Sequence, residues 1–282
     1  MIRTRENVMR AVFLFAACVT ILCVALICAF LFVKGMPAIA EIGVFKFLGG
    51  MRWKPGNDLY GIFPMIIGSL YVTAGAIIVG VPLGVLTAVY LARFCPKRIH
   101  RLLSPAVSLM AGIPSVIYGF FGIVVLVPAI RAVFGGGKSV LTASILLGIM
   151  ILPTVITVSE SAIRAVPQTF YEGALALGAS HERSVFFAAL PAAKSGILAS
   201  VVLGIGRAVG ETMAVVMVAG NQAVIPASIL KGVRTLTANI VLEMGYAADL
   251  HREALIATAV VLFVFILLIN LLLSSVKRRA AK

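Results

Sequence analysis

Long apolar runs separated by short polar stretches dominate the pattern along the chain. Five runs are almost free of charged residues, and a sixth is interrupted by an arginine and a glutamate. The hydrocarbon core of a bilayer is about 30 Å thick, so a helix needs roughly 20 apolar residues to cross it. The pattern therefore predicts an all-α integral membrane protein with six transmembrane helices, at residues 11–33, 59–92, 102–130, 139–159, 195–220 and 254–276. We expect them to form one membrane domain over residues 1–282.

The composition and the charge distribution support a membrane location. Apolar residues make up 61% of the chain and charged residues 12%, which excludes an ordinary soluble domain. The net charge of +14 is spread over many loops, so it favours contact with anionic lipid over binding to nucleic acid, which needs a concentrated basic patch. More Lys and Arg residues fall in the pieces that share a side with the N-terminus, which places both termini in the cytoplasm. The first run exceeds the roughly 7–15 apolar residues of a signal peptide, so we expect it to be retained.

No enzyme, nucleotide or metal site is recognisable in the sequence. Residues 135–139 resemble the end of a phosphate-binding loop, but Ala132 stands where that motif requires its first glycine. The three histidines lie in separate loops, and the four cysteines lack the spacing of metal ligands. We predict that the chain has no catalytic residue, no metal site and no cofactor.

The segment between the first two runs, residues 35–60, contains aromatic residues among prolines and glycines. Trp53 and Tyr60 are of the type that lies at the lipid headgroup level. We therefore expect this segment to lie at the outer membrane interface.

Several residues in the runs are expected to shape the helices. Pro114 lacks the N–H that would bond to the carbonyl of Met110, so we predict a kink or break there. Within a membrane, such a break persists only where protein or a water-filled cavity satisfies the freed groups. The hydroxyls of Ser115 and Tyr118 either line a path there or support the kink. Glycine pairs in two runs should allow close approach between helices: Gly80 with Gly84, and Gly206 with Gly210.

Arg207 and Glu211 are the two charged residues inside the fifth run. At a spacing of four they should share one helix face and lie close enough to pair. Each costs about 2.5–3.5 kcal/mol at the centre of a membrane helix, so the pair is a functional candidate or a structural lock between helices. A guanidinium suits an oxyanion because it stays charged and offers a fork of donors. We hypothesise that Arg207 attracts an anion, that Glu211 neutralises it between transport events, and that Thr212 adds a hydroxyl to the path.

The cytoplasmic connection at residues 160–194 is expected to form two short helices. Thr169 and Glu172 have the spacing of a capping box for the first, and Gly178 provides a left-handed exit. Ser180 can cap the second, which should end at Pro191. Their apolar faces either pack under the chain's own bundle or enter a groove of a partner.

This connection resembles the EAA loop of binding-protein-dependent ABC importer permeases. The residues that carry the resemblance are Glu172, Gly173, Ala174, Gly178, Leu190 and Pro191. The resemblance implies a type I, MetI-like permease bundle whose coupling helices contact an ATPase subunit. ATP hydrolysis would then take place in that partner and be transmitted through this loop.

Residues 206–212, Gly-Arg-Ala-Val-Gly-Glu-Thr, resemble the signature of phosphate-importer permeases. Residues 57–61, 113–115 and 237–239 are similar to the PstC type within that family. The resemblance implies import of inorganic phosphate across a bacterial inner membrane. The implied partners are a PstA-like second permease, a dimer of PstB-like ATPase subunits and a periplasmic phosphate-binding protein.

Three alternatives remain open at the level of the sequence. The chain could be a permease for another oxyanion, a secondary transporter or channel that acts alone, or a membrane scaffold without transport. Dependence on a nucleotide-binding partner separates an importer from a transporter that acts alone. A scaffold would have no need of an arginine inside the membrane.

Overall fold

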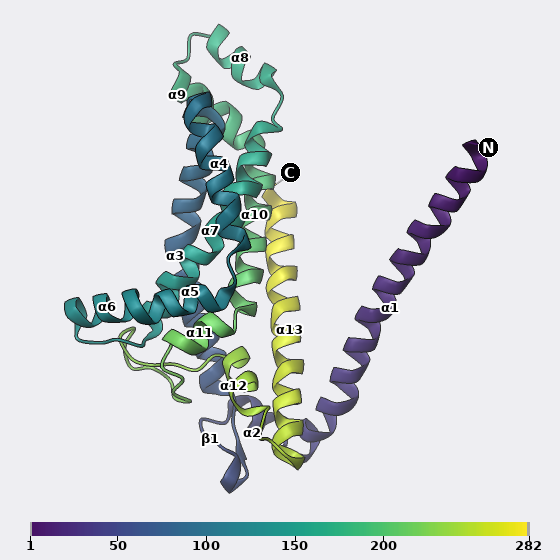
Figure 1. Cartoon of the computed structure of the whole chain (residues 1–282), viewed down its shortest axis with the longest axis vertical. Coiled ribbons are helices and arrows are strands. Elements are labelled where there is room, and N and C mark those ends of the chain that lie inside the picture. Colours follow the sequence, from purple (N-terminus) through teal and green to yellow (C-terminus); the bar gives the residue numbers. More distant parts are fainter. Residues whose placement is uncertain (1, 281–282) are drawn as a thin grey trace.

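The protein is almost entirely helical, as the computed structural model of residues 2–280 shows (Figure 1). Six longer helices run along the molecule: α1 (Ile2–Ile42), α3 (Phe63–Val89), α4 (Lys97–Gly112), α7 (Val140–Arg164), α10 (Leu190–Gly210) and α13 (Asp249–Ala280). The shorter elements are α2 (Val44–Gly49), β1 (Trp53–Lys54), β2 (Leu59–Tyr60), α5 (Ser115–Phe121), α6 (Val127–Phe134), α8 (Gln168–Ala176), α9 (His181–Ser184), α11 (Met213–Val218) and α12 (Leu236–Glu243). The chain also has one 3₁₀ turn, η1 (Pro55–Asn57), and three π-helical turns, η2 (Tyr90–Phe94), η3 (Gly122–Leu126) and η4 (Val185–Ala189).

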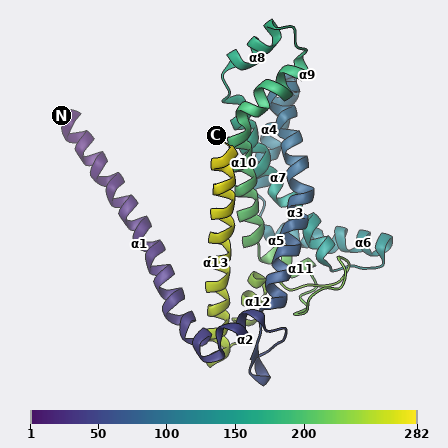
Figure 2. The ribbon, with the colours of Figure 1, turned by 180° about the vertical axis from the view of Figure 1, so that it is seen from behind.

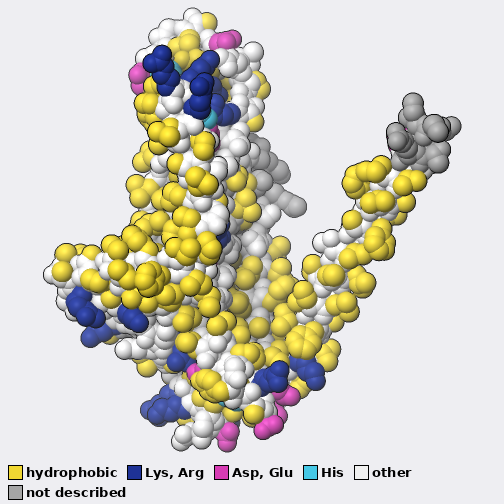
Figure 3. Space-filling model, viewed as in Figure 1, with side chains coloured by type: hydrophobic (Ala, Val, Ile, Leu, Met, Phe, Trp, Pro, Cys, Tyr) yellow, Lys and Arg dark blue, Asp and Glu magenta, His cyan; other side chains and the backbone are white. Residues whose placement is uncertain are grey.

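Six helical segments in the described residues are long and apolar enough to cross a membrane, as predicted. They are Glu6–Ile42, Phe63–Phe94, Ser115–Phe134, Val140–Arg164, His181–Gly210 and Asp249–Leu272. Apolar side chains cover the flanks of the molecule in Figure 3, and Lys and Arg gather toward its ends. A lipid-facing flank with polar ends is the distribution expected of a multi-pass membrane protein.

The centre of the bundle is built on α7, which packs against α3 and α10. Gly80 and Gly84 allow this packing, because a Cβ at Gly80 would lie 2.6 Å from the carbonyl oxygen of Gly148 and one at Gly84 would lie 2.8 Å from Val155. The prediction of close approach is therefore confirmed for this pair. A Cβ at Gly206 or Gly210 would meet no atom of the described residues within 4 Å, so for that pair close approach stays a prediction.

A second apolar cluster closes the end of the bundle that carries the β-hairpin. It joins the end of α1, α2, both strands, α12 and the start of α13. Trp53 and Tyr60 pair across the antiparallel strands, and they are only 6% and 5% exposed. Both rings are therefore buried within the protein and do not contact lipid headgroups, while the interfacial location of the segment stays a prediction.

The helix α1 meets α13 near this end and then diverges from it, as both views show (Figures 1 and 2). At the contact, a Cβ on Gly35 would come within 2.8 Å of Val260, so the two helices touch closely there. The start of α1 and the end of α13 point toward the end that carries α8 and α9 (Figure 1). The two ends therefore lie on the same side of the bundle, as expected for a chain that crosses the membrane an even number of times.

The third apolar run departs from the predicted span 102–130. The chain runs along the bundle as α4, breaks at Ile113 and Pro114, and continues as α5, η3 and α6 across the bundle direction (Figure 1). The break itself was predicted from Pro114, since the residue before a proline avoids helical dihedrals. The apolar segment long enough to cross a membrane is Ser115–Phe134, not 102–130.

Two further boundaries differ from the prediction. Leu59 and Tyr60 belong to β2, so the second span begins at Phe63. The fifth helical segment starts at His181, passes through the wide turn η4 and continues into α10 without stopping at Pro191. A π-type turn leaves more room ahead of the proline ring, which explains why Pro191 does not end the helix.

Candidate functional site: two interrupted helices around Arg207

The fifth span is interrupted near the charged residues. The helix α10 ends at Gly210, Glu211 is extended at φ −69° and ψ 132°, and α11 starts at Met213. Arg207 lies in the last turn of α10, whereas Glu211 lies beyond its end. The prediction that the two residues share one helical face and pair is therefore wrong. The spacing rule assumed a continuous helix, and the chain leaves the helix one residue before Glu211.

Glu211 serves as a cap instead. Its Oε1 accepts a hydrogen bond from the backbone N–H of Ala214 at 3.2 Å, which satisfies one free donor at the start of α11. Its backbone carbonyl accepts a bond from the Thr237 hydroxyl at 3.0 Å, and Thr237 lies in the first turn of α12. These contacts hold the interruption at a fixed place.

Arg207 forms no ion pair among the residues that the structure describes. All four ion pairs among the described residues involve Glu160 or Glu243. The Arg207 side chain is half-buried, and the neighbouring positions Gly206 and Gly210 face open space. The guanidinium thus lies on an uncrowded face of α10.

The break in the third run lies near the same place. The Tyr118 hydroxyl donates to the carbonyl oxygen of Met110 at 2.9 Å, which is the acceptor that Pro114 leaves free. Tyr118 therefore supports the break, which is the second of the two roles considered for it. Ser115 opens α5 and is half-buried. The Thr212 hydroxyl donates to the Gly210 carbonyl at 3.2 Å.

The pieces that follow the two breaks pack against each other. A Cβ on Gly119 in α5 would lie 2.5 Å from the sulfur of Met217 and 3.1 Å from the Cα of Ala214, both in α11. Only glycine allows the two short helices to approach this closely. The structure thereby brings Ser115, Tyr118, Arg207, Glu211 and Thr212 into one region of the bundle.

The predicted coupling residues lie at the opposite end from the β-hairpin, on and around α8 and α9 (Figure 1). Gly178 has φ +83° and Ser180 caps α9 by accepting from the N–H of Arg183, as predicted. The capping box is wrong, because α8 already begins at Gln168 and has no side-chain cap. Helix α8 has no fully buried residue and Leu177 is 91% exposed, but Tyr171 and Val185 pack against the chain's own cluster around Ile163, so the bundle covers this segment only in part. Glu172, Gly173 and Ala174 lie in α8, while Leu190 and Pro191 open α10.

One cluster of functional groups was missed at the sequence level. The buried carboxylate of Glu243 accepts hydrogen bonds from Trp53 Nε1 at 2.8 Å and Arg234 Nη1 at 2.6 Å, and it lies 2.9 Å from His251 Nε2. Arg234 also donates to Asn239 Oδ1 at 3.0 Å. Trp53 and Glu243 are 190 residues apart, so no local spacing indicates that they meet. The sequence predicts Trp53 only as an interfacial aromatic, so no signal in the sequence pointed to this cluster.

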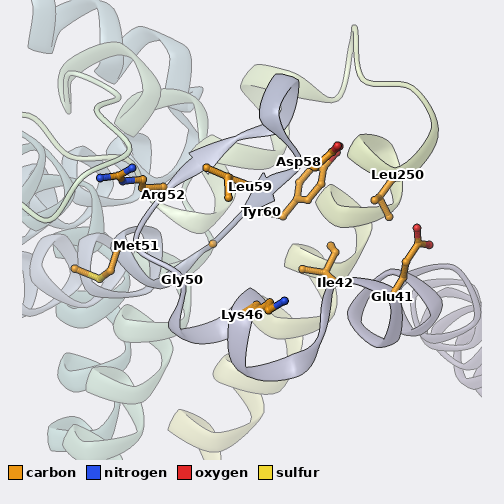
Figure 4. A pocket seen from close by; sticks show the side chains of 11 residues that line it. Glu41, Ile42, Lys46, Gly50, Met51, Arg52, Asp58, Leu59, Tyr60 and Leu250 are labelled. Atoms are coloured by element: carbon orange, nitrogen blue, oxygen red, sulfur yellow. The ribbon is translucent and has the colours of Figure 1, made fainter.

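A cleft of about 810 Å³ lies beside this cluster and away from the interrupted helices. Figure 4 shows the side chains that line it, among them the charged residues Glu41, Lys46, Arg52 and Asp58. Two acidic and two basic side chains thus line the cleft. The cleft therefore lacks the predominantly positive lining that an oxyanion path requires.

Comparison with known proteins identifies the class to which this architecture belongs. Residues 80–282 match the family described as binding-protein-dependent transport system inner membrane component. The chain is 38% identical over 257 residues to the probable ABC transporter permease protein YqgH of Bacillus subtilis, covering 87% of this chain and 83% of that protein. It is 34% identical over 261 residues to the phosphate transport system permease protein PstC of Mesorhizobium japonicum, covering 85% and 80%.

Solved structures share the fold at lower sequence identity. A chain of the inward-facing MetNI methionine ABC transporter has a TM-score of 0.65 at 20% identity, over 82% of this chain and all of that one. A chain of a bacterial alginate ABC transporter has a TM-score of 0.62 at 14% identity, over 99% and 100%. These likenesses confirm the predicted MetI-like bundle, and with the family match they establish that the chain is a member of the binding-protein-dependent transport system inner membrane components.

Proposed function

We propose that this chain is the transmembrane permease subunit of an ABC importer that moves inorganic phosphate into the cytoplasm. The observation that carries the proposal is Arg207, a permanent cation in an apolar helix that has no carboxylate partner among the described residues. Such a charge is expensive in a membrane unless an anion or an aqueous path faces it. The similarity to a phosphate transport permease supports phosphate as the anion.

The geometry around Arg207 suits a transient anion site. Interrupted helices are where many transporters place their substrate sites, because the freed backbone groups need a polar cavity. The guanidinium offers a planar fork of donors to phosphate oxygens. Glu211, just beyond the helix end, adds a negative charge that keeps the anion from being held too tightly. Phosphate would thus be attracted at Arg207 and still be able to leave.

The open face of α10 requires a neighbour. A Cβ at Gly206 or Gly210 would meet no atom of the described residues within 4 Å, although glycines at this spacing commonly mark helix contacts in membranes. We infer that a second, PstA-like permease covers this face and that the path runs between the two subunits. A periplasmic phosphate-binding protein would deliver phosphate at the end that carries the β-hairpin.

The exposed segment from α8 to α9 is the proposed contact with a dimer of PstB-like ATPase subunits. Leu177 and Phe187 are 91% and 78% exposed at this end, and an apolar helix pair of this kind can enter a groove of a partner. This end and both termini would then face the cytoplasm of a bacterium, with the bundle in its inner membrane. ATP hydrolysis would take place in the partner, and this chain would contribute no catalytic residue.

Uptake of radiolabelled phosphate tests the proposal in cells that lack this chain and receive it on a plasmid. We expect Arg207→Gln to abolish uptake while the protein still reaches the membrane, and Arg207→Lys to retain part of it. Arg131→Gln is the matched control, since Arg131 is an exposed arginine at the far end of α6.

Two results would contradict the proposal. Wild-type uptake by the Arg207→Gln variant would remove the role of the guanidinium. Restoration of sulfate uptake, with no effect on phosphate uptake, would assign the permease to another oxyanion.

A further inference from the structure

A cavity of about 370 Å³ lies where α3 and η2 end, α4 begins and α7 ends. It is at the end of the molecule that carries α8 and α9, where Figure 3 shows Lys and Arg side chains gathered. Five basic side chains line it: Arg93, Lys97, His100, Arg101 and Arg164. They do not touch the region around Arg207, so the proposed transport path does not account for them.

Two of these arginines build the walls of the cavity. Arg93 Nη2 donates to the carbonyl oxygen of Ile163 at 2.9 Å, near the end of α7. Arg164 Nη2 donates to the carbonyl oxygen of Leu91 at 2.8 Å, in η2. Each arginine therefore caps the end of the other's helix, where carbonyls lack partners. The Nε of Arg93 is buried and has no hydrogen-bond partner among the described residues.

The positive charge of the cavity is only partly compensated. Glu160 lies 2.7 Å from His100 Nε2 and 2.8 Å from Arg164 Nε. It is the one carboxylate that pairs with any of the five basic groups in the described part of the chain, and Lys97 and Arg101 form no ion pair there. Four permanent cations thus share one anion.

The start of α4 increases this imbalance. The first turn of a helix carries a partial positive charge, which favours acidic side chains there. The first turn of α4 contains no acidic residue and instead contributes Lys97 and His100 to the cavity. These basic residues are repelled by the positive end of the helix dipole and by one another. An anion in the cavity would relieve both repulsions.

We propose that this cavity binds a phosphoryl oxyanion, supplied by an anionic lipid headgroup or by free inorganic phosphate at the same end of the molecule. Arginine and lysine form the strongest hydrogen bonds to such oxygens, and basic pockets between membrane helices bind lipid headgroups. The volume lies within the range of about 300–1,000 Å³ that is typical of ligand pockets. The proposal does not rest on the transport function, because occupancy of the cavity is measured directly.

Cys95 lines the cavity and provides the measurement. The other three cysteines lie in α1, so a Cys18→Ala, Cys23→Ala, Cys28→Ala background leaves a single thiol. The full chain in neutral detergent is treated with a neutral maleimide, and the alkylation rate at Cys95 is followed by mass spectrometry. One arm adds phosphatidylglycerol against phosphatidylcholine, and the other adds sodium phosphate against sodium chloride at equal ionic strength.

We expect the alkylation rate to fall about tenfold at a ligand concentration about ten times the dissociation constant, in at least one arm. Slowing by phosphatidylglycerol identifies a lipid headgroup, and slowing by sodium phosphate identifies the free ion. Arg101→Gln should raise the concentration for half-protection about tenfold, as expected for one lost charge-assisted bond. Rates are compared with and without ligand within each variant, because the substitution also changes the intrinsic reactivity of the thiol.

Arg98→Gln is the matched control, since Arg98 is exposed, lies in the same turn of α4 and does not line the cavity. It removes the same charge and should leave the protection unchanged. The proposal is overturned if neither phosphatidylglycerol nor phosphate slows the alkylation. It is also overturned if Arg98→Gln weakens the protection as much as Arg101→Gln, because the effect would then be general electrostatics.

Discussion

Replacing Glu243 by glutamine is the sharpest test of what holds the β-hairpin end together. The Glu243 carboxylate is the only group that contacts Trp53, Arg234 and His251 at once among the described hydrogen bonds. These residues come from β1, from the loop before α12 and from α13. A single side chain thus ties three distant parts of the chain to α12.

The expected loss of stability follows from the burial of the ion pair between Arg234 and Glu243. Removing one partner of a buried salt bridge costs about 3–5 kcal/mol, because the other charge stays buried and uncompensated. The Arg234 side chain is 18% exposed and the Glu243 side chain 9%, so a little solvent still reaches the guanidinium. A glutamine keeps one acceptor oxygen and can still bond to one of the donors. We therefore expect Glu243→Gln to lower the free energy of unfolding by about 3 kcal/mol, at the lower end of that range.

Trp53 is the single tryptophan of the chain, and it donates directly to Glu243. Its emission during denaturant titration in detergent micelles reports the opening of this end of the molecule. The control is Glu41→Gln, since Glu41 is an exposed carboxylate near the same end without an ion pair in the described residues. Surface substitutions usually change the free energy of unfolding by no more than about 0.5 kcal/mol. If the values for Glu243→Gln and the control differ by no more than this, the reasoning is refuted.

A double-mutant cycle separates the ion pair from the rest of the network. Once Arg234→Gln has removed the cation, Glu243→Gln should cost less, because no uncompensated charge remains. Strictly additive losses would show that the two groups do not interact in the folded protein.

The same carboxylate predicts a dependence of stability on pH. Burial raises the pKa of Glu243, but the hydrogen bonds from Trp53, His251 and Arg234 and the charge of Arg234 outweigh burial and lower the pKa below its usual 4.5. A lowered pKa means that the folded state binds fewer protons than the unfolded state in this range. The stabilisation is therefore complete above about pH 4.5 and is lost as the pH falls toward the lowered pKa. The Glu243→Gln variant should lack this part of the acid sensitivity.

Three further predictions concern other parts of the bundle. Gly80→Ala should destabilise the chain by about 1–3 kcal/mol in thermal unfolding, because its Cβ would meet the backbone of α7, whereas Gly206→Ala should not lower the stability of the isolated chain. Tyr118→Phe should cost about 1 kcal/mol and reduce uptake while leaving insertion normal, since it removes one hydrogen bond at the break. Leu177→Glu should abolish co-purification of the ATPase partner without affecting folding, while Phe45→Ser, an equally exposed change at the opposite end, should leave it intact.

The positions of most spans could be predicted because apolar run length is a local property. A helix crosses a bilayer when enough consecutive residues prefer lipid, and this preference does not depend on neighbouring helices. The third run shows the limit of that argument. Pro114 marks the break in the sequence. The direction of the chain after the break depends on the contact between Gly119 and α11, and this contact cannot be predicted from hydropathy along the sequence.

Arg207 and Glu211 were identified as unusual residues, although their geometry was predicted incorrectly. Both charges are visible in the sequence because they interrupt an apolar run. Whether they pair depends on the backbone between them, and the helix stops at Gly210 although no proline follows. The stop is held by a local cap, in which Glu211 accepts from the N–H of Ala214, and by a tertiary contact with Thr237, which a spacing rule cannot detect.

The two interruptions are best understood as one structural unit. Tyr118 satisfies the carbonyl that the first break frees, Glu211 caps the helix that follows the second, and Gly119 lets the two following helices touch. Neither break is stable alone in a membrane, because each leaves backbone groups that lipid cannot satisfy. A movement that displaces α11 must therefore also displace α5. If Arg207 lies on the proposed path, a change in access to it would then involve both interrupted helices together.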